Sequence, residues 1–224
     1  MKRSEVNALQ REAVEFFEQQ NFYLPTWAFW SEQEWEKNRT RAMEVIENKL
    51  GWDLTDFGLG KFYEIGLLLF TLRNGKVGDI AGKDYAEKIM IVREEQVTPW
   101  HFHWQKMEDI INRGGGNLVI ELCNATSDER MADTPVTVQI DGITKTVEAR
   151  GSISLKPGES ITLPPYLYHN FYGEAGMGMV LVGEVSRVND DEKDNRFLDP
   201  IGRFPLIEED EPPLYLLCNE YPVE

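Results

Sequence analysis

Histidine is scarce in this chain of 224 residues, which contains only three. Cysteine is scarcer still. Neither Cys123 nor Cys218 belongs to a Cys-x-x-Cys pair, so the sequence offers no thiolate metal site of that kind and no disulfide framework. Long apolar runs are also missing, because the longest, residues 65–72, has only the length of a strand. The N-terminus lacks the apolar core of a signal peptide, and we therefore expect a cytoplasmic protein.

Positive charge is also in short supply. Lysine and arginine number 23 against 39 aspartates and glutamates, which gives a formal net charge of -16 and a pI near 4.7. Nucleic acids and anionic membranes attract clusters of lysine and arginine, so neither is an expected partner. No group of basic residues is dedicated to gripping a phosphate. A small uncharged molecule fits this composition better.

The first part of the chain has the pattern of helices. Apolar residues recur at helical spacing over residues 4–20, and Ser31 with Glu34 forms a capping box that opens a second helix, expected to end near Leu50. The aromatic-rich stretch between them, residues 24–30, is too irregular for a helix. These features predict an N-terminal helical extension over residues 1–56.

From about residue 57 the period changes to that of strands. Short runs rich in β-forming residues alternate with turn signals such as Asn74-Gly75 and Asp141-Gly142. The expected strands cover residues 61–72, 88–93, 96–104, 118–124, 136–140, 144–148, 153–155, 160–163 and 179–188.

About eight to ten short strands predict an antiparallel sandwich or barrel. We expect one domain over residues 1–224, with the β-barrel core at 57–188 and a C-terminal extension at 189–224. The acidic run at 208–211 in that extension predicts a solvated loop, and residues 214–218 could form a last strand.

Two of the three histidines stand one residue apart. On an extended strand His101 and His103 point to the same face, so both can reach one metal ion. A carboxylate from Glu108 and a third imidazole from His169 would complete a set of three nitrogens and one oxygen, which leaves coordination positions open for a substrate. The sequence therefore predicts a metal site held by these four residues.

The spacing around these residues resembles that of the cupins. His-x-His, four residues, Glu108, six residues and a glycine match the first cupin motif, and Gly158, Pro164 and His169 match the second. The resemblance implies a mainly β fold, the cupin double-stranded β-helix barrel. Three positions depart from the pattern: Glu95 and Tyr166 stand where glycine is usual, and Gly173 stands where asparagine is usual.

Longer stretches resemble the D-lyxose isomerase family of sugar isomerases. They cover residues 24–30, 98–116, 184–191 and 203–205. The resemblance implies a homodimer and a divalent metal, Mn²⁺ first, with Co²⁺, Zn²⁺ or Fe²⁺ as other choices. It also implies interconversion of free aldoses and ketoses, with D-lyxose and D-xylulose or D-mannose and D-fructose as the pairs.

Aldose–ketose isomerisation needs a base that moves a proton between C1 and C2 through an enediol. Glu184 is the first candidate, because it is an isolated acid on a strand face otherwise formed by Val180 and Val182. Asp191 is a second candidate. Lys106 shares a face with Glu108 on extended backbone, so its ammonium could stabilise a developing oxyanion or hold a substrate hydroxyl.

Two further residues are candidates for substrate contacts. Trp27 could offer an apolar face to a sugar, and Arg203 could bind sugar hydroxyls, a role that rests mainly on the family resemblance. The ligand set alone also fits an Fe(II) cupin dioxygenase, and a non-catalytic sugar-binding cupin is a third reading. A polar cavity containing Lys106 and Glu184 would favour the isomerase, since an oxygenase site tends to be apolar.

Overall fold

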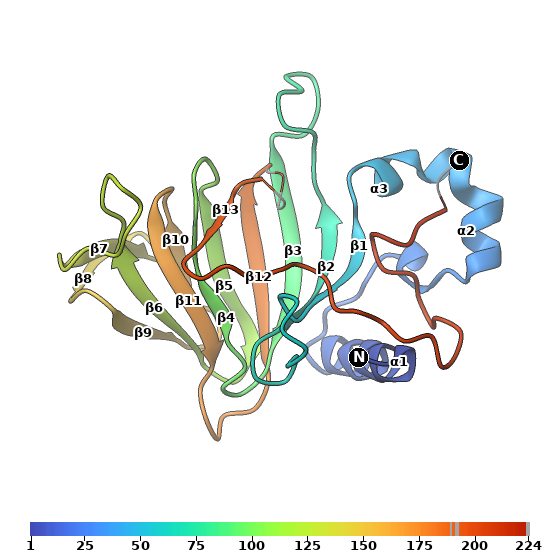
Figure 1. Ribbon diagram of the computed structural model, residues 1–224, viewed down its shortest axis with the longest axis horizontal. Coiled ribbons are helices and arrows are strands. Elements are labelled where there is room, and N and C mark those ends of the chain that lie inside the picture. The colour runs from blue at the N-terminus through green and yellow to red at the C-terminus, as the bar shows by residue number, and fades with distance from the viewer. Residues whose placement is uncertain (189, 191–192, 223–224) are drawn as a thin grey trace.

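The chain consists of a helical part followed by strands, as the change of sequence period predicts (Figure 1). The computed structural model describes residues 1–188, 190 and 193–222. Its helices are α1 (Arg3–Gln19), η1 (Thr26–Phe29), α2 (Glu32–Asn38), η2 (Arg39–Ala42) and α3 (Met43–Glu47). Its strands are β1 (Gly51–Thr55), β2 (Leu67–Arg73), β3 (Tyr85–Val92), β4 (Thr98–His103), β5 (Glu108–Gly115), β6 (Leu118–Asn124), β7 (Val136–Ile140), β8 (Ile143–Val147), β9 (Gly151–Leu155), β10 (Ser160–Leu163), β11 (Leu167–Gly173), β12 (Val180–Arg187) and β13 (Asn195–Phe197).

The strands form two antiparallel sheets. The larger has the order β1-β2-β3-β12-β5-β10-β7-β8, and the smaller has the order β13-β4-β11-β6-β9. The helices lie at one end of the molecule, next to β1 and β2, and the β7–β8 hairpin lies at the other (Figure 1). This mainly β arrangement with two sheets is cupin-like, and the prediction of the fold class is confirmed.

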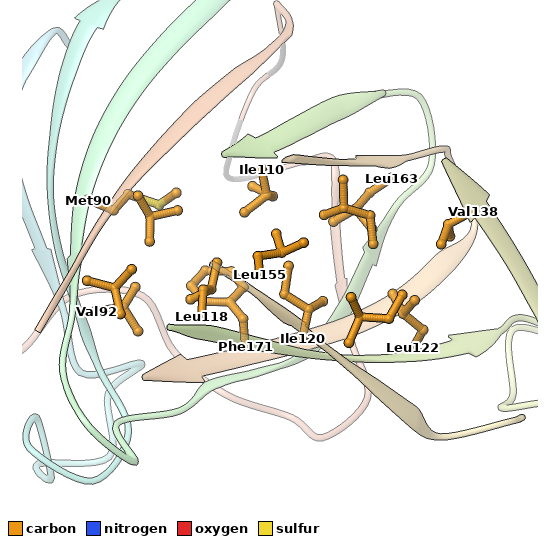
Figure 2. Packing of buried hydrophobic residues seen from close by; sticks show 14 of the residues in the cluster. Met90, Val92, Ile110, Leu118, Ile120, Leu122, Val138, Leu155, Leu163 and Phe171 are labelled. Atoms are coloured by element: carbon orange, nitrogen blue, oxygen red, sulfur yellow. The ribbon is translucent and has the colours of Figure 1, made fainter. Parts of the chain in front are cut away.

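The main core lies between the two sheets. Ile110, Val180 and Val182 from the larger sheet pack with Ile120 and Phe171 from the smaller one, and all are buried. Figure 2 shows side chains of this cluster pointing toward one another from facing strands. Each fully buried aliphatic side chain of this kind contributes about 1.5–3 kcal/mol to stability. The cluster thus fixes the positions of the strands that carry the site.

A second core joins the helices to the outside of the larger sheet. Val6, Leu9 and Phe17 on α1 pack against Trp52 on β1 and Phe70 on β2. The rings of Phe17 and Trp52 are stacked with their centroids 6.2 Å apart. The apolar face that the helical spacing predicts is therefore the face that covers the sheet.

The predicted second helix is broken into three pieces. Ser31 accepts a hydrogen bond from the backbone N–H of Glu34, which confirms the capping box. The helix turns to η2 at Arg39 and resumes as α3, and residues 48–50 are not helical. The sequence analysis also missed β1, which lies inside the segment expected to be a helical extension and pairs antiparallel with β2.

The other differences concern strands. β5, β11 and β13 were not among the expected strands, although β11 carries His169 and the other two pair with strands that carry site residues. The expected strand at 61–72 starts only at Leu67. The suggested strand at 214–218 is wrong, because this segment makes only an isolated bridge between Trp52 and Leu217. No helix among the described residues combines the length and apolarity needed to cross a membrane.

Two of the departures from the cupin pattern keep the backbone shape that glycine would allow. Glu95 has a φ of 55° and Tyr166 a φ of 61°, both in the left-handed region. A residue with a Cβ costs roughly 1–2 kcal/mol in this conformation. The turns are therefore formed without glycine, at the cost of local strain. Tyr166 also packs on Phe102, with ring centroids 5.2 Å apart.

The acidic run at 208–211 is an exposed loop, as predicted, and it is also bound to α1. Glu209 accepts hydrogen bonds from the buried Arg3 guanidinium, and Asp210 accepts from both the backbone N–H and the hydroxyl of Ser4. Glu211 accepts from the side-chain amide of Asn7. Negative charge at a helix N-terminus is stabilising, which explains why the acidic run lies there.

Candidate metal centre

The three histidines lie on two neighbouring strands. His101 and His103 are on β4 and His169 is on β11, and the antiparallel register places His169 directly opposite His101. The ring centroids of these two residues are 4.2 Å apart. All three side chains are buried, at 7%, 5% and 1% exposure. The structure thus brings together the three imidazoles that the sequence predicted, although His169 is distant in sequence.

Backbone carbonyls fix the orientation of each ring. His101 Nδ1 lies 2.7 Å from the carbonyl oxygen of Pro99, His169 Nδ1 lies 3.0 Å from that of Leu167, and His103 Nδ1 lies 3.1 Å from that of Asp194. A carbonyl oxygen only accepts hydrogen bonds, so each Nδ1 carries the proton. Each Nε2 is then unprotonated and carries a lone pair, the form in which histidine binds a metal ion.

The remaining ring atoms fit a metal ion. One ligand atom from each histidine lies within 4.8 Å of the others. Nε2 of His103 and Nε2 of His169 are buried and have no hydrogen-bond partner among the described residues. Oε1 of Glu108 lies 3.2 Å from both of these nitrogens. Buried polar atoms without partners are rare and call for an explanation, and a divalent cation between these four residues supplies one.

Charge in this region also favours metal binding. Burial lowers the pKa of His101 well below its usual range, and the neighbouring His169 acts in the same direction. Burial likewise lowers the pKa of His103, and Lys106 adds to the effect. Burial alone would raise the pKa of Glu108, but Lys106 and His103 outweigh it and hold that pKa well below its usual range. Neutral imidazoles and an ionised carboxylate are the forms that ligate metals.

A buried chain of charges continues from Glu108 into the larger sheet. Lys106 Nζ lies 2.6 Å from Oε2 of Glu108 and 3.0 Å from Oε1 of Glu184. Lys88 Nζ lies 3.4 Å from the same Oε1 of Glu184, and the hydroxyl of Ser186 donates to it at 3.0 Å. Three donors therefore hold one carboxylate oxygen of Glu184. Val180 and Val182 share its strand face and are buried, as the strand period predicts.

These residues line one cavity of about 80 Å³. Its polar lining includes the four charged side chains just described and two of the histidines, and its apolar side chains come from both sheets. The lining residues are Thr55, Phe57, Leu67, Leu69, Lys88, Met90, Thr98, His101, His103, Lys106, Glu108, Ile110, Phe171, Glu184, Asn195, Phe197 and Arg203. A larger cavity of about 460 Å³ shares Lys88 and Arg203 with it.

The remaining candidate site residues from the sequence lie in different places. Arg203 lines both cavities, and its guanidinium pairs with the buried carboxylate of Asp53 on β1. Trp27 packs among aromatic rings, 5.0 Å from Phe70 and 6.2 Å from Trp35 between centroids, and it does not line the metal cavity. Its role as a substrate contact stays a prediction. Asp191 lies outside the described residues.

Sequence reasoning missed Lys88 and Asp194. Lys88 opens the apolar run of β3 and lies directly opposite Glu184 in the β3–β12 ladder. It is the lone charge on a strand face otherwise formed by Ala86, Met90 and Val92, the same signal that identified Glu184, and could have been found in that way. Asp194 stands in a polar stretch without such a signal. Its carboxylate nevertheless accepts a hydrogen bond from the backbone N–H of Lys106, and its backbone carbonyl accepts one from His103 Nδ1.

A family model for D-lyxose isomerase matches residues 1–221 of the chain. The chain belongs to the D-lyxose isomerase family. It is 56% identical over 223 residues to a D-lyxose/D-mannose isomerase of Escherichia coli O157:H7, covering 99% of this chain and 98% of the relative. Identity to a D-lyxose/D-mannose isomerase of Serratia proteamaculans is 54% over the same shares. The family resemblance found in the sequence is confirmed.

Solved structures with the same fold include L-ribose isomerases. That of Cellulomonas parahominis, solved with L-ribose, has a TM-score of 0.60 and 15% identity, covering 93% of this chain and 98% of the other. That of Acinetobacter sp. DL28, also with L-ribose, has a TM-score of 0.59 and 14% identity, with 89% and 93% covered. At this identity the likeness concerns the fold alone, and it supports the cupin-like assignment.

Proposed function

We propose that this protein is a divalent-metal-dependent aldose–ketose isomerase that acts on free sugars. The expected substrate pairs are D-lyxose with D-xylulose and D-mannose with D-fructose, in keeping with the names of its relatives. The observation that carries the proposal is the buried cluster of His101, His103, His169 and Glu108, of which all but His169 line the same cavity as the Lys106–Glu184 pair. Ligands and proton-transfer groups are then within one small volume.

The four ligands would hold the metal, and we propose Mn²⁺, with Co²⁺, Zn²⁺ or Fe²⁺ as substitutes. Three imidazole nitrogens and a carboxylate oxygen suit such borderline ions. A bound divalent cation would act as a Lewis acid for the hydroxy-carbonyl end of the open-chain sugar. Oε1 of Glu108 faces the histidines, and its Oε2 faces the ammonium of Lys106. The lysine therefore keeps this carboxylate oriented and ionised.

Glu184 is the proposed base. Its Oε1 is held by Lys88, Lys106 and Ser186, which fixes the carboxylate on the cavity wall. These donors are on Oε1, so Oε2 is the atom we assign to carrying the proton between C1 and C2. A positioned base of this kind typically contributes about 10²–10⁴-fold to the rate. Asp191 remains a second candidate from the sequence.

Lys106 and Arg203 are the proposed polar contacts for the sugar. The Lys106 ammonium lies between two carboxylates and can stabilise the oxyanion that develops as the enediol forms. Arg203 lines both the metal cavity and the larger one, so its guanidinium is placed to bind the sugar hydroxyls that lie farther from the carbonyl end of the substrate. This charged wall favours the isomerase over an Fe(II) dioxygenase, whose site tends to be apolar.

The proposal also includes a homodimer in the cytoplasm. The homodimer is what the family resemblance implies, and the cytoplasmic location is the expectation stated from the sequence. Size-exclusion chromatography with light scattering would measure the assembly directly. A monomeric mass would contradict the homodimer and leave the assignment of the isomerase intact.

One experiment tests the activity. The protein is stripped with a chelator, reloaded with Mn²⁺, and incubated with D-lyxose or D-mannose, and ketose is measured. We expect ketose from both sugars, and in D₂O we expect deuterium at the carbon that exchanges its proton. The matched variant Glu184→Gln should bind the metal normally but lose about 10²–10⁴-fold in turnover. No ketose with any divalent ion would overturn the isomerase assignment.

A further inference from the structure

Asp194 binds three different atoms of the β4–β5 region. Its Oδ1 accepts a hydrogen bond from the backbone N–H of Gln105 and its Oδ2 accepts one from that of Lys106, both at 3.0 Å. Its own carbonyl oxygen accepts the proton of His103 Nδ1 at 3.1 Å. Asp194 is only 7% exposed. One residue of the C-terminal extension is thus bonded to a proposed metal ligand and to the backbone of the proposed catalytic lysine.

The contact to His103 differs from those of the other two histidines. His101 and His169 bind the carbonyl of the residue two positions earlier on their own strands, Pro99 and Leu167. His103 instead binds a carbonyl that lies far along the chain. The orientation of this one ring therefore depends on how the segment around residue 194 is placed.

The same segment is anchored to the strand beneath it. Asn195, the next residue, lies opposite His103 where β13 pairs with β4, and Phe197 lies opposite His101. The rings of Phe197 and His101 have centroids 5.4 Å apart. Because backbone pairing fixes β13, the carboxylate and the carbonyl of Asp194 are held at fixed positions over the turn between β4 and β5.

That turn carries Lys106. Its backbone N–H and that of Gln105 point at the two oxygens of one carboxylate, which is a charge-assisted arrangement about twice as strong as a neutral one. The Lys106 ammonium must reach Glu108 at 2.6 Å and Glu184 at 3.0 Å. A shift of the turn would therefore change both contacts and move the ring of His103.

We propose that Asp194 is a positioning residue, which sets the ring of His103 and the ammonium of Lys106 together. The inference rests on the proposed metal-dependent function. It adds a residue that does not bind the metal but positions two residues that serve the site. Asp194 itself lies behind the ligands and does not touch reacting atoms. Outer contacts of this kind typically change metal affinity or activity by about 10–100-fold.

Two variants and one control test the proposal. Asp194→Ala removes both carboxylate bonds, whereas Asp194→Asn keeps an acceptor for only one backbone N–H. Asp79→Asn is the matched control, because Asp79 also accepts from two backbone amides, those of Ala81 and Gly82, and is not itself among the residues that line either cavity. Metal-free protein is titrated with Co²⁺, and both the affinity and the visible absorption of the bound ion are recorded.

We expect Asp194→Ala to bind Co²⁺ about 10–100-fold more weakly with a changed absorption spectrum, and Asp194→Asn to lie between it and the parent. In the Mn²⁺-loaded variants kcat should fall while KM changes little, since the residue does not touch the sugar. Hydrogen exchange at the amides of Gln105 and Lys106 should become faster. The Asp79→Asn control should match the parent in all these measurements.

Unchanged Co²⁺ affinity and spectrum, together with a lowered stability of the metal-free variants, would show that Asp194 has a structural role only and overturn the proposal. A parent protein that binds Co²⁺ but makes no ketose would overturn the proposed function alone, because the Co²⁺ comparison still decides the role of Asp194. A parent that binds no Co²⁺ at all would overturn both.

Discussion

The ammonium of Lys106 lies 3.0 Å from Oε1 of Glu184, and the two side chains are only 3% and 7% exposed. They come from different parts of the fold, since Lys106 precedes β5 and Glu184 lies on β12. Lys106 also bonds Glu108 on its other side. A buried pair of this kind contributes little net stability, but removing one partner leaves an uncompensated charge.

Replacing Lys106 by Met should therefore harm both stability and activity. Glu108 and Glu184 would lose the cation between them, and breaking a buried pair typically costs about 3–5 kcal/mol. We expect a loss of that order in the free energy of unfolding by urea, and a loss of turnover of at least about 10²-fold. Lys61→Met is the control, because Lys61 is 60% exposed and pairs with the exposed Glu64; it should change stability by less than about 1 kcal/mol. Equal stability of both variants would contradict the argument.

Much of the fold could be predicted because its periodicity is strong. The alternation in β7 and the helical spacing in α1 mark the faces that are buried in the structure. β1 was missed because all five of its residues are buried, so a two-residue alternation is absent. β5 was missed because its glycine-rich end is typical of a turn, yet seven of its residues pair with β12.

The metal ligands could be predicted because their spacing is fixed by strand geometry. Lys88 and Asp194 were missed for another reason. Their roles depend on which strands become neighbours: Lys88 lies opposite Glu184 only because β3 pairs with β12, and Asp194 reaches His103 only because β13 pairs with β4. Such long-range pairings cannot be read from local periodicity. The same holds for the acidic run at 208–211, whose partners are in α1.

Metal removal should lower the thermal stability. A ligand that binds only the folded protein stabilises it by about 2.7 kcal/mol when its concentration is a hundred times its Kd. We therefore expect the Tm measured by scanning calorimetry to be higher with Mn²⁺ than after chelation. In His169→Ala the shift should vanish, because the ligand that joins β11 to β4 is lost. A variant that keeps the full Mn²⁺ shift would contradict the assignment of His169 as a ligand.

Arg3→Ala should destabilise the protein in a pH-dependent way. Arg3 is 3% exposed and binds both Glu209 and Glu220, and its hydrogen bond holds the pKa of Glu209 below the usual value. A lowered pKa in the folded state gives stability that is present above the unfolded pKa of about 4.3 and is lost as the pH falls through the folded pKa. We expect a loss of about 1–3 kcal/mol at pH 7 by urea unfolding.

The difference between the Arg3→Ala variant and the parent should shrink when the measurement is repeated near pH 3, because protonation of Glu209 in the folded state weakens its bond to Arg3 as the pH falls through its lowered pKa. Arg11→Ala is the control, since Arg11 lies exposed on the same helix. It should have little effect at either pH. A difference for Arg3→Ala that stays constant between the two pH values would contradict the role of the carboxylates.

Glu95→Gly should stabilise the protein although it removes a side chain. Glu95 is exposed and has a φ of 55°, at the position where the cupin pattern has glycine. Relief of about 1–2 kcal/mol of backbone strain is partly offset by about 0.5–1 kcal/mol of extra chain entropy in the unfolded state. We expect a net gain of up to about 1 kcal/mol, or about 2–4 °C in the Tm.

Glu95→Ala separates the backbone effect from the effect of charge. Alanine keeps the Cβ that is strained at positive φ but removes the carboxylate, which stands beside that of Glu94. If strain is the cause, Glu95→Ala should leave the Tm close to that of the parent while Glu95→Gly raises it. An equal rise in both variants would assign the gain to relief of repulsion between the two carboxylates, and the left-handed backbone at this turn would then carry no measurable strain.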